Sequence, residues 1–326
     1  NLYPTIVTGA NVLIPNDQSF SGRLNRYVSF YGNAAYTYKG RYSFSVSGRR
    51  DASNLFGVRT NDKWSPLWSA GLAWDVFKER FYRIKQIPML RLRATYGLSG
   101  NADPGRSGYS VMAYGGPVSP FSLTPMASIT QFNNPDLRWE KLATFNLGAD
   151  FKAFGNRIQG SIEYYHKRGK DLLGFTPVDY TTVPASRLAK NVASMKVNGW
   201  DMSITSINIL KPIVWESSLN FNYNKDEVTD YLITNRSAIN HLSGGLAISA
   251  MVGKPVYGIY VYPWAGLDPK TGDPMGWLNG KPSKDYNTLA GSAWPIDSLK
   301  YAGPSMPRVF GSLGNCFSYN GLTLTV

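Results

Sequence analysis

The chain has two histidines, His166 and His241, and their side chains could take part in the widest range of catalytic reactions. A hydrolase built into a β-barrel would hold a serine and a histidine on neighbouring strand faces near the rim. His166 falls on the apolar set of positions at the end of a predicted strand, and His241 falls in a long predicted loop. We therefore expect no catalytic residue, and a barrel-embedded hydrolase remains only an alternative.

Two acids, Asp150 and Glu163, lie on one face of a predicted hairpin and could resemble a glycosidase pair. With Asp150 opposite Gln159 and Glu163 opposite Asn146, their separation is roughly 13 Å at about 3.3 Å per residue. Glycoside hydrolysis needs the two carboxyl groups roughly 5 to 9.5 Å apart. The spacing predicts solvated charges rather than a catalytic pair.

Three aspartates, Asp268, Asp273 and Asp285, stand in a turn-rich segment that could offer hard oxygen ligands to calcium. Their spacing matches no EF-hand, so we predict no metal site. The lone Cys316 excludes an internal disulfide and has no neighbouring ligand. Glycines after a predicted strand lead into no helix or Lys-Ser/Thr pair, so we predict no phosphate loop and no cofactor. These glycines are Gly97, Gly100, Gly105 and Gly108.

The net charge of +13 arises from 34 basic and 21 acidic residues, a balance that could suggest nucleic acid. The basic residues are dispersed, however, and Arg91 and Arg93 share one strand face without any recognition motif around them. Contact with anionic lipid headgroups and a polar lumen explains the charge better. We therefore expect outer-membrane lipid, and no nucleic acid, among the partners.

The elements that must position these residues are strands joined alternately by short and long connections. A barrel inserted from one side of a membrane has short turns on the near side and long loops on the far side. The short connections are Lys39–Arg41, Phe154–Gly155, Leu210–Ile213 and Asn320–Gly321, with Lys78–Pro88 of middle length. The long ones are Ala52–Ser65, Leu98–Glu140, Lys167–Lys196 and Lys225–Met306.

Register tests the hairpins, because directly opposed residues must share a face of the sheet. A two-residue turn at Phe154–Gly155 predicts apolar pairs and a polar complementary face. The apolar pairs are Phe151 with Ile158, Ala149 with Gly160, Leu147 with Ile162 and Phe145 with Tyr164. A type I′ turn at Asn320–Gly321 predicts Tyr319 opposite Leu322 and Phe317 opposite Leu324. A three-residue loop around Gly40 predicts Tyr38 opposite Tyr42, Tyr36 opposite Phe44 and Ala34 opposite Val46.

Strand length and composition favour a membrane over a soluble antiparallel protein. The predicted strands run to roughly 9 to 13 residues, which suits a tilted membrane crossing. Mean hydropathy is only −0.24, as a barrel with a polar lumen requires. Aromatic residues make up 14% of the chain and gather near predicted strand ends. These are Tyr36, Tyr38, Trp64, Trp68, Trp74, Trp139, Tyr164, Tyr165, Trp200 and Trp215. The predicted fold is all-β, an antiparallel transmembrane β-barrel with long extracellular loops.

Several separate segments resemble the SusC/RagA family, the TonB-dependent outer-membrane transporters of Bacteroidetes. They read RDASNLFG (50–57), LRLRATYGLSGN (90–101), NPDLRWEK (134–141), NRIQGSIEYYHKRGKDLL (156–173), NVASMKVNGWD (191–201) and GLDPKTGDP (266–274). The resemblance implies a multi-pass barrel in the outer membrane that imports a nutrient, either a glycan fragment such as an oligosaccharide or a peptide. It also implies a SusD-like surface lipoprotein and the TonB complex as partners.

The resemblance runs from about Asn25 to Val326, and residues 1–326 are expected to form part of one TonB-dependent receptor β-barrel domain. About ten strands of an implied barrel of about 22 are expected, without the plug domain, the TonB-contacting segment or the closing strands. On this expectation the isolated chain would aggregate through two unpaired sheet edges. A passive porin or a surface adhesin would share the loop pattern and remains an alternative function.

Ligand contacts are expected from aromatic residues in the predicted loops, because sugar faces stack on rings. The same rings could instead pack the loops together or against the lipoprotein. The candidates are Trp64, Tyr109, Tyr114, Phe132, Trp264 and Trp277.

Overall fold

The computed structural model describes residues 2–4, 9, 11–13, 26–54, 64–101, 103, 110–114, 124, 127–132, 134–177, 187–232, 238–242, 250–291 and 294–326. Ten strands form one antiparallel sheet in which sequence neighbours pair in order from β3 to β19. They are β3 (Tyr27–Tyr38), β4 (Tyr42–Ser53), β5 (Trp64–Asp75), β6 (Met89–Asn101), β9 (Glu140–Ala153), β10 (Ile158–Pro177), β11 (Arg187–Ile209), β12 (Val214–Tyr231), β18 (Val309–Tyr319) and β19 (Leu322–Thr325). The predicted all-β, antiparallel fold is confirmed.

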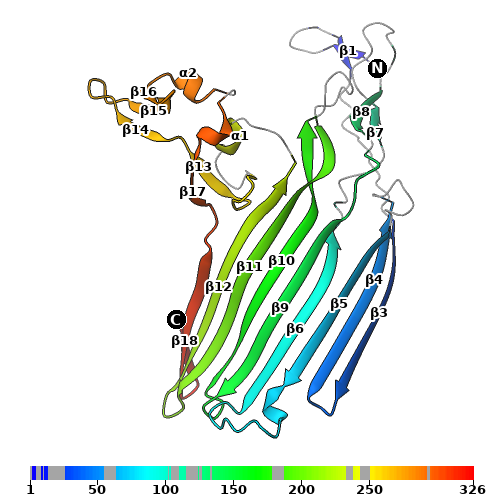
Figure 1. Ribbon diagram of the computed structural model, residues 1–326, viewed down its shortest axis with the longest axis vertical. Coiled ribbons are helices and arrows are strands. Elements are labelled where there is room, and N and C mark those ends of the chain that lie inside the picture. The colour runs from blue at the N-terminus through cyan, green and yellow to red at the C-terminus, as the bar shows by residue number, and fades with distance from the viewer. Residues whose placement is uncertain are drawn as a thin grey trace.

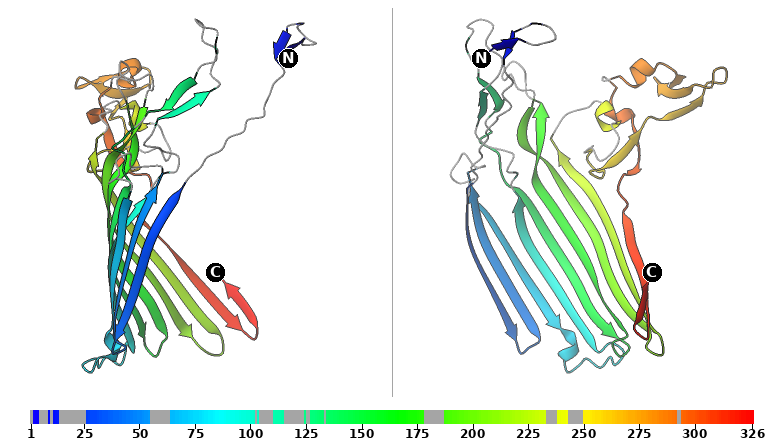
Figure 2. Two further views of the ribbon diagram at one scale, coloured as in Figure 1. Left: turned by 90° about the vertical axis from the view of Figure 1, so that its right-hand side faces the viewer. Right: turned by 180° about the vertical axis from the view of Figure 1, so that it is seen from behind.

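The sheet is a curved wall of tilted strands with unlike ends (Figures 1 and 2). At one end, here called the near rim, the strands are joined by residues 39–41, 76–88, 154–157, 210–213 and 320–321. At the other end, the far rim, the strands are joined by residues 54–63, 102–139, 178–186 and 232–308. All four connections are longer than the near-rim turns except 76–88, and the two longest carry small strands, with helices in the last. The alternation predicted from the sequence is therefore present in space, and it gives the wall the polarity of a membrane barrel.

The register at two near-rim hairpins is the predicted one. Tyr38 pairs with Tyr42 across the loop at Gly40, and Tyr319 pairs with Leu322 across Asn320–Gly321. Asn320 has a φ of 46° and Gly321 a φ of 82°. Both central residues thus take the left-handed conformation that a type I′ turn requires.

The predicted register of the β9–β10 hairpin is wrong by two residues. Ala153 pairs with Ile158, Phe151 with Gly160 and Ala149 with Ile162, so the turn has four residues instead of two. Phe154, Gly155 and Asn156 all have positive φ, a run that a two-residue turn cannot hold. Because side chains alternate with a period of two, this shift changes the partners and leaves both faces as predicted.

Three central strands are longer than predicted. β10 has 20 residues, β11 has 23 and β12 has 18, against the roughly 9 to 13 expected from a membrane crossing alone. Residues 167–177 and 187–196, predicted as a long loop, instead continue β10 and β11. Their outer parts, 171–177 and 187–191, pair with each other as a ribbon beyond the rest of the sheet (Figure 1). The sequence predicts that these strands end at the membrane surface. In the structure, backbone hydrogen bonds between β10 and β11 continue beyond that point.

The outward face of the sheet is apolar and exposed, as a lipid-facing surface must be. Its aromatic residues fall into two belts. Toward the near rim, Tyr42 stacks on Trp74 and Trp215 on Phe317. Toward the far rim lie the ring pairs Phe30–Trp64, Trp68–Tyr96 and Tyr164–Trp200. Trp68 and Trp74 are about 20 Å apart along β5 at about 3.3 Å per residue, comparable to the apolar band of about 25 Å.

Two aromatic residues assigned to strand ends by sequence take other roles. Trp139 is buried in the small core of the far rim with Leu137, Ala189 and Leu173. Tyr165 is on the opposite, inward face, where its ring covers the cross-strand partner Gly199. An aromatic ring over a strand glycine shields backbone that has no side chain of its own.

The far rim carries small modules built from the long connections. The β7–β8 hairpin (Val111–Tyr114 and Ala127–Gln131) lies in the 102–139 connection. A separate pair, β1 (Leu2–Pro4) with β2 (Asn11–Leu13), precedes the first strand of the sheet. The largest follows β12 and comprises α1 (Ile239–Leu242), β13 (Gly258–Val261), β14 (Trp264–Leu267), β15 (Pro274–Leu278), β16 (Lys281–Ser283), α2 (Tyr286–Leu289) and β17 (Lys300–Pro304). Within the described part of the chain, none of the helices has the length and apolar character needed to cross a membrane.

Candidate functional site

The inward face of the wall is polar, and its charges are organised around Arg93 on β6. Arg93 Nε and Nη2 donate to Asp150 at 2.8 and 2.9 Å, and Nη2 also donates to Glu163 at 2.6 Å. Asn146 Nδ2 donates to the other oxygen of Glu163 at 3.1 Å. One guanidinium thus joins three neighbouring strands, β6, β9 and β10, through bonds of the strong charge-assisted kind.

This arrangement overturns the separation predicted for Asp150 and Glu163. The prediction of about 13 Å used the two-residue turn; the true register brings Asp150 opposite Ser161 and Glu163 opposite Gly148. Both carboxylates then reach the same guanidinium group. Arg93 partly balances their charge, and the cluster links three neighbouring strands on the inward face of the sheet.

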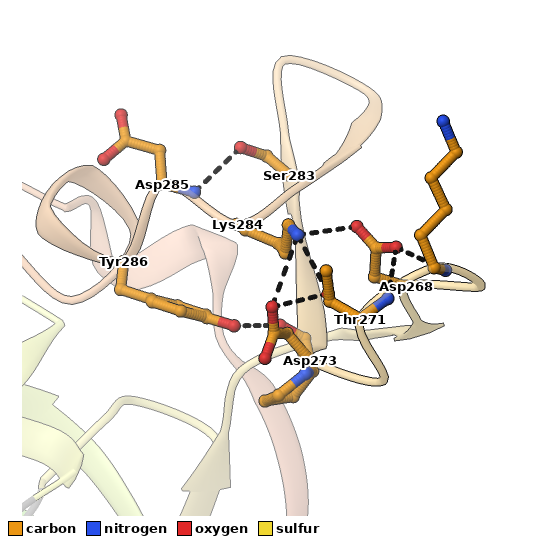
Figure 3. A network of polar contacts seen from close by, with 9 residues as sticks. Asp268, Thr271, Asp273, Ser283, Lys284, Asp285 and Tyr286 are labelled. Atoms are coloured by element: carbon orange, nitrogen blue, oxygen red, sulfur yellow. Dashed lines mark hydrogen bonds and ion pairs between the residues drawn. The ribbon is translucent and has the colours of Figure 1, made fainter.

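The far-rim module after β12 is held by a network around Lys284 (Figure 3). Lys284 Nζ lies 2.7 Å from Asp268 Oδ2, 3.3 Å from Asp273 Oδ2 and 3.0 Å from Thr271 Oγ1. Asp268 Oδ1 also accepts the backbone N–H of Lys270 at 2.8 Å. The hydrogen bond from Lys284, followed by that from the Lys270 backbone, lowers the pKa of Asp268 to about 2.

The same lysine occupies the place between these aspartates that a calcium ion would take. The cation between Asp268 and Asp273 is the Lys284 ammonium, whose pKa is raised chiefly by the hydrogen bond to Asp268. Asp285 instead caps α2, accepting from the Thr288 backbone N–H at 3.1 Å and its hydroxyl at 2.6 Å. Across the described residues, no three His, Cys, Asp or Glu side chains are grouped so as to hold a metal.

An aromatic groove on this module contains two of the six predicted ligand-contacting residues. Trp264 on β14 and Trp277 on β15 lie together because Trp277 Nε1 donates to the Trp264 carbonyl oxygen at 3.1 Å. Tyr286 lines the same groove and is fixed by its hydroxyl, which donates to the Pro274 carbonyl oxygen at 2.6 Å. The groove has a volume of about 230 Å³ and is also lined by Leu289 and Trp294. Trp264 is 64% and Trp277 44% exposed, so their rings are open to a ligand.

Trp64 and Phe132 are not among the residues that line this groove. Trp64 lies on the outward face, where its ring is 5.9 Å from that of Phe30 and 5.0 Å from the Arg50 guanidinium carbon. Tyr114 ends β7, and Phe132 directly follows β8 and is half-buried. Tyr109 lies outside the described residues. Their role in ligand binding stays a prediction.

The structure also brings together, in the same module, a cluster of polar aromatic side chains around the buried Tyr260 that sequence reasoning missed. His241 on α1 meets the edge of Tyr260 on β13 at 5.7 Å, and Tyr260 is 5.7 Å from Tyr301 on β17. Burial raises the pKa of Tyr260 to about 12. The contacts span 60 residues of sequence, and only the pairing of β13 with β17 could have signalled them.

His166 is placed on the outward face, as predicted. Its Nδ1 lies 2.7 Å from Asn198 Oδ1, on the neighbouring strand β11. The Tyr164 hydroxyl donates to the same Asn198 oxygen at 3.2 Å. The imidazole is therefore part of a cross-strand contact of the wall.

Comparison with protein families identifies the class of protein to which this sheet belongs. The family model described as TonB dependent receptor-like, beta-barrel matches residues 2–295. The chain belongs to this family. As a TonB-dependent receptor barrel of the SusC/RagA type it is an outer-membrane protein, and the expectation drawn from its motifs is confirmed.

Curated relatives place the receptor among SusC-like proteins. It is 34% identical over 208 residues to TonB-dependent receptor P39 of Formosa agariphila, covering 62% of this chain and 19% of P39. It is 27% identical over 263 residues to TonB-dependent receptor SusC of Bacteroides thetaiotaomicron, covering 76% of this chain and 26% of SusC. The chain thus spans about a fifth to a quarter of the length of these relatives.

Solved structures agree with the fold of the receptor. The RagAB peptide transporter is similar with a TM-score of 0.76 and 26% identity, over 92% of this chain and 33% of that chain. The outer membrane transporter YddB from Escherichia coli matches with a TM-score of 0.52 at 13% identity, covering 91% of this chain and 32% of that chain. The second likeness concerns the fold alone.

Proposed function

We propose that this receptor takes part in TonB-dependent import of an oligosaccharide or a peptide across the outer membrane. The observation that carries the proposal is a wall with a polar inner face, joined at the far rim to a module with an open aromatic groove. A polar lumen suits a hydrophilic solute, and exposed indoles suit sugar faces or apolar peptide side chains. The likeness to TonB-dependent receptor SusC supports TonB-dependent import, and the likeness to the RagAB peptide transporter supports the peptide class.

The chain would act as part of one barrel domain that is completed by further strands and a plug. The chain covers 33% of the RagAB peptide transporter chain that it resembles. In the described sheet, β3 and β19 each pair on one side only. A barrel leaves no such edges, because unpaired backbone groups are costly in lipid.

The proposed partners are a SusD-like surface lipoprotein over the far rim and the TonB complex on the other side of the membrane. The far-rim modules rise beyond the end of the ten-stranded sheet (Figure 2). They offer the lipoprotein a surface outside the bilayer, and the aromatic groove would lie at or near that contact. The energy of import would come through TonB and the plug, not from the residues described above.

Uptake by the native cells tests the proposal. Labelled oligosaccharides and labelled peptides of matched size are supplied to wild-type cells, to cells without this receptor and to cells without TonB. We expect uptake of one class to fall to background in both mutants. Uptake that depends on the receptor but persists without TonB would indicate a passive porin, and surface binding without uptake would indicate an adhesin.

A further inference from the structure

The near rim carries a dense set of exposed cations. Among its turn residues, 39–41, 76–88, 154–157, 210–213 and 320–321, the single acid is Glu79, which is ion-paired with Arg41 at 2.8 Å. The adjoining strand-end acid Asp75 is ion-paired with Lys78 at 2.7 Å. The exposed cations are Lys39, Lys78, Arg80, Arg83, Lys85, Arg157 and Lys211. The rim is therefore strongly positive, and in the described structure its two neighbouring carboxylates are already engaged.

Apolar side chains are exposed between these cations. Phe81 is 65% and Phe154 60% exposed, and Ile84, Leu210 and Ile213 are each more than 40% exposed. Exposed apolar side chains are unfavourable in turns that face water. The boundary between headgroups and acyl chains accommodates both basic and apolar side chains. The composition of the near rim is that of a surface that enters the headgroup layer.

An apolar groove runs up the outward face directly above this rim. It has a volume of about 560 Å³ and follows two neighbouring rungs of the sheet. Tyr38, Tyr42, Trp74 and Leu92 form one rung, and Tyr36, Phe44, Leu72, Ala94 and Leu147 form the other. All of these side chains belong to the lipid-facing set, and Ala94 is the smallest of them. The groove thus has the lining and the place of an acyl-chain site.

The groove and the cations meet at its lower end. Lys39 Nζ lies 5.0 Å from the centre of the Tyr38 ring, and Phe81 packs on Trp74 with ring centres 6.1 Å apart. The turn 76–88, which contains Arg80, Arg83 and Lys85, joins the two strands that contribute Trp74 and Leu92. A molecule with an acyl chain in the groove would have its headgroup among these cations.

We propose that the near rim and this groove form a binding site for an anionic phospholipid of the inner leaflet. Lys39, Arg80, Arg83 and Lys85 contact the headgroup phosphates, and one acyl chain lies along the groove between Trp74 and Leu147. Charge complementarity selects the headgroup, because each basic residue near an anionic membrane surface adds about a fivefold preference. The proposal rests on the membrane placement of the barrel and is independent of the transported substrate.

The experiment measures lipids retained by the intact receptor, purified in mild detergent with equal phosphatidylglycerol and phosphatidylethanolamine, by native mass spectrometry. The test variant is K39Q/R80Q/R83Q, and the matched control, K270Q/K281Q/K300Q, removes three exposed cations from the far-rim module. We expect the test variant to lose at least tenfold of its preference for phosphatidylglycerol and the control to keep it. An unchanged preference, or an equal loss in both variants, would overturn the headgroup assignment.

The groove is tested separately by Ala94→Leu, with Ala70→Leu as a control on the same outward face but outside the groove. We expect A94L to lower retention of both phospholipids at least threefold and A70L to leave it unchanged. Heat-modifiable migration on gels shows that each variant is a folded barrel. Equal retention by A94L, A70L and wild type would exclude the groove, as would retention of lipid A in place of phospholipid. Because no transport is measured, failure here leaves the proposed import untouched.

Discussion

Asn134 donates a hydrogen bond from Nδ2 to the backbone carbonyl oxygen of Ala189 over 2.7 Å, across 55 residues of sequence. Both residues are buried. Asn134 opens the NPDLRWEK segment, and Ala189 lies just before the NVASMKVNGWD segment, so two separate family motifs meet at the far rim. The same contact region includes Asn191, whose side-chain amide donates to the carbonyl oxygens of Arg138 and Asp171.

Replacing Asn134 by Ala is expected to loosen this junction. The Ala189 carbonyl would lose its donor in a buried place, which costs about 1 to 3 kcal/mol. The temperature at which the heat-modifiable band unfolds should fall by several degrees. Asn33→Ala, at an exposed position of β3, should leave that temperature unchanged. Equal effects of N134A and N33A would contradict the importance of the contact.

Replacing Arg93 by Met should destabilise the wall by leaving Asp150 and Glu163 without their shared cation. Because the three side chains are 28 to 34% exposed, we expect an effect of only about 1 kcal/mol after solvent screening. The triple variant R93M/D150N/E163Q should recover most of the loss. Unfolding of the three proteins in urea checks this, and a triple variant less stable than R93M would show that the carboxylates do not repel each other.

The far-rim module should respond to acid in a defined range. The pKa of Asp268 is lowered from 3.8 to about 2 by its hydrogen bonds to Lys284 and the Lys270 backbone. A lowered pKa means that the contribution of Asp268 to stability is complete above about pH 4 and is lost as the pH falls toward 2. Tryptophan fluorescence between pH 7 and 2, to which Trp264 and Trp277 contribute two of the nine indoles in this chain, is compared between wild type and the variant below. Asp268→Asn should remove this transition, and an identical acid profile for D268N would refute the assignment.

The aromatic groove makes a prediction about ligands. Trp264→Ala and Trp277→Ala should each weaken binding of the imported substrate about tenfold, because stacking on an indole contributes about 0.5 to 1.5 kcal/mol beyond buried area. Trp200→Ala removes an exposed indole from the outward face and serves as a control for general loss of aromatic residues. Calorimetric titration of the intact receptor measures all three. Unchanged binding in W264A and W277A would eliminate the groove as a ligand site.

Period-2 patterning was enough to predict the ten-stranded sheet and its two faces, because an apolar face cannot change sides without a one-residue slip. Turn chemistry was sufficient where it was unambiguous, as at Asn320–Gly321. It failed at Phe154–Gly155, since no local signal in the sequence requires Phe154 and Asn156 to take positive φ as well. That error hid the approach of Asp150 and Glu163 to Arg93.

The candidate site was predictable only in part for a different reason. Trp264 and Trp277 lie on adjacent strands of one small sheet, so their meeting follows from local hairpin pairing. The His241, Tyr260 and Tyr301 cluster depends on the pairing of β13 with β17, across a long insertion without a repeating pattern. The register between β13 and β17 could therefore not be predicted from the sequence.

The paired strands β10 and β11 extend from the lipid bilayer into the aqueous phase outside it. At about 3.3 Å per residue, the 20 residues of β10 span roughly 65 Å, far more than an apolar band of about 25 Å. The lower half of this pair has an apolar face toward lipid, while Leu173 and Ala189 in its upper half pack in the buried cluster with Leu137 and Trp139. The part of the ribbon above the bilayer therefore has a protein core of its own. For this reason we expect the arrangement of the far-rim loops to depend on this core and not on the thickness of the membrane.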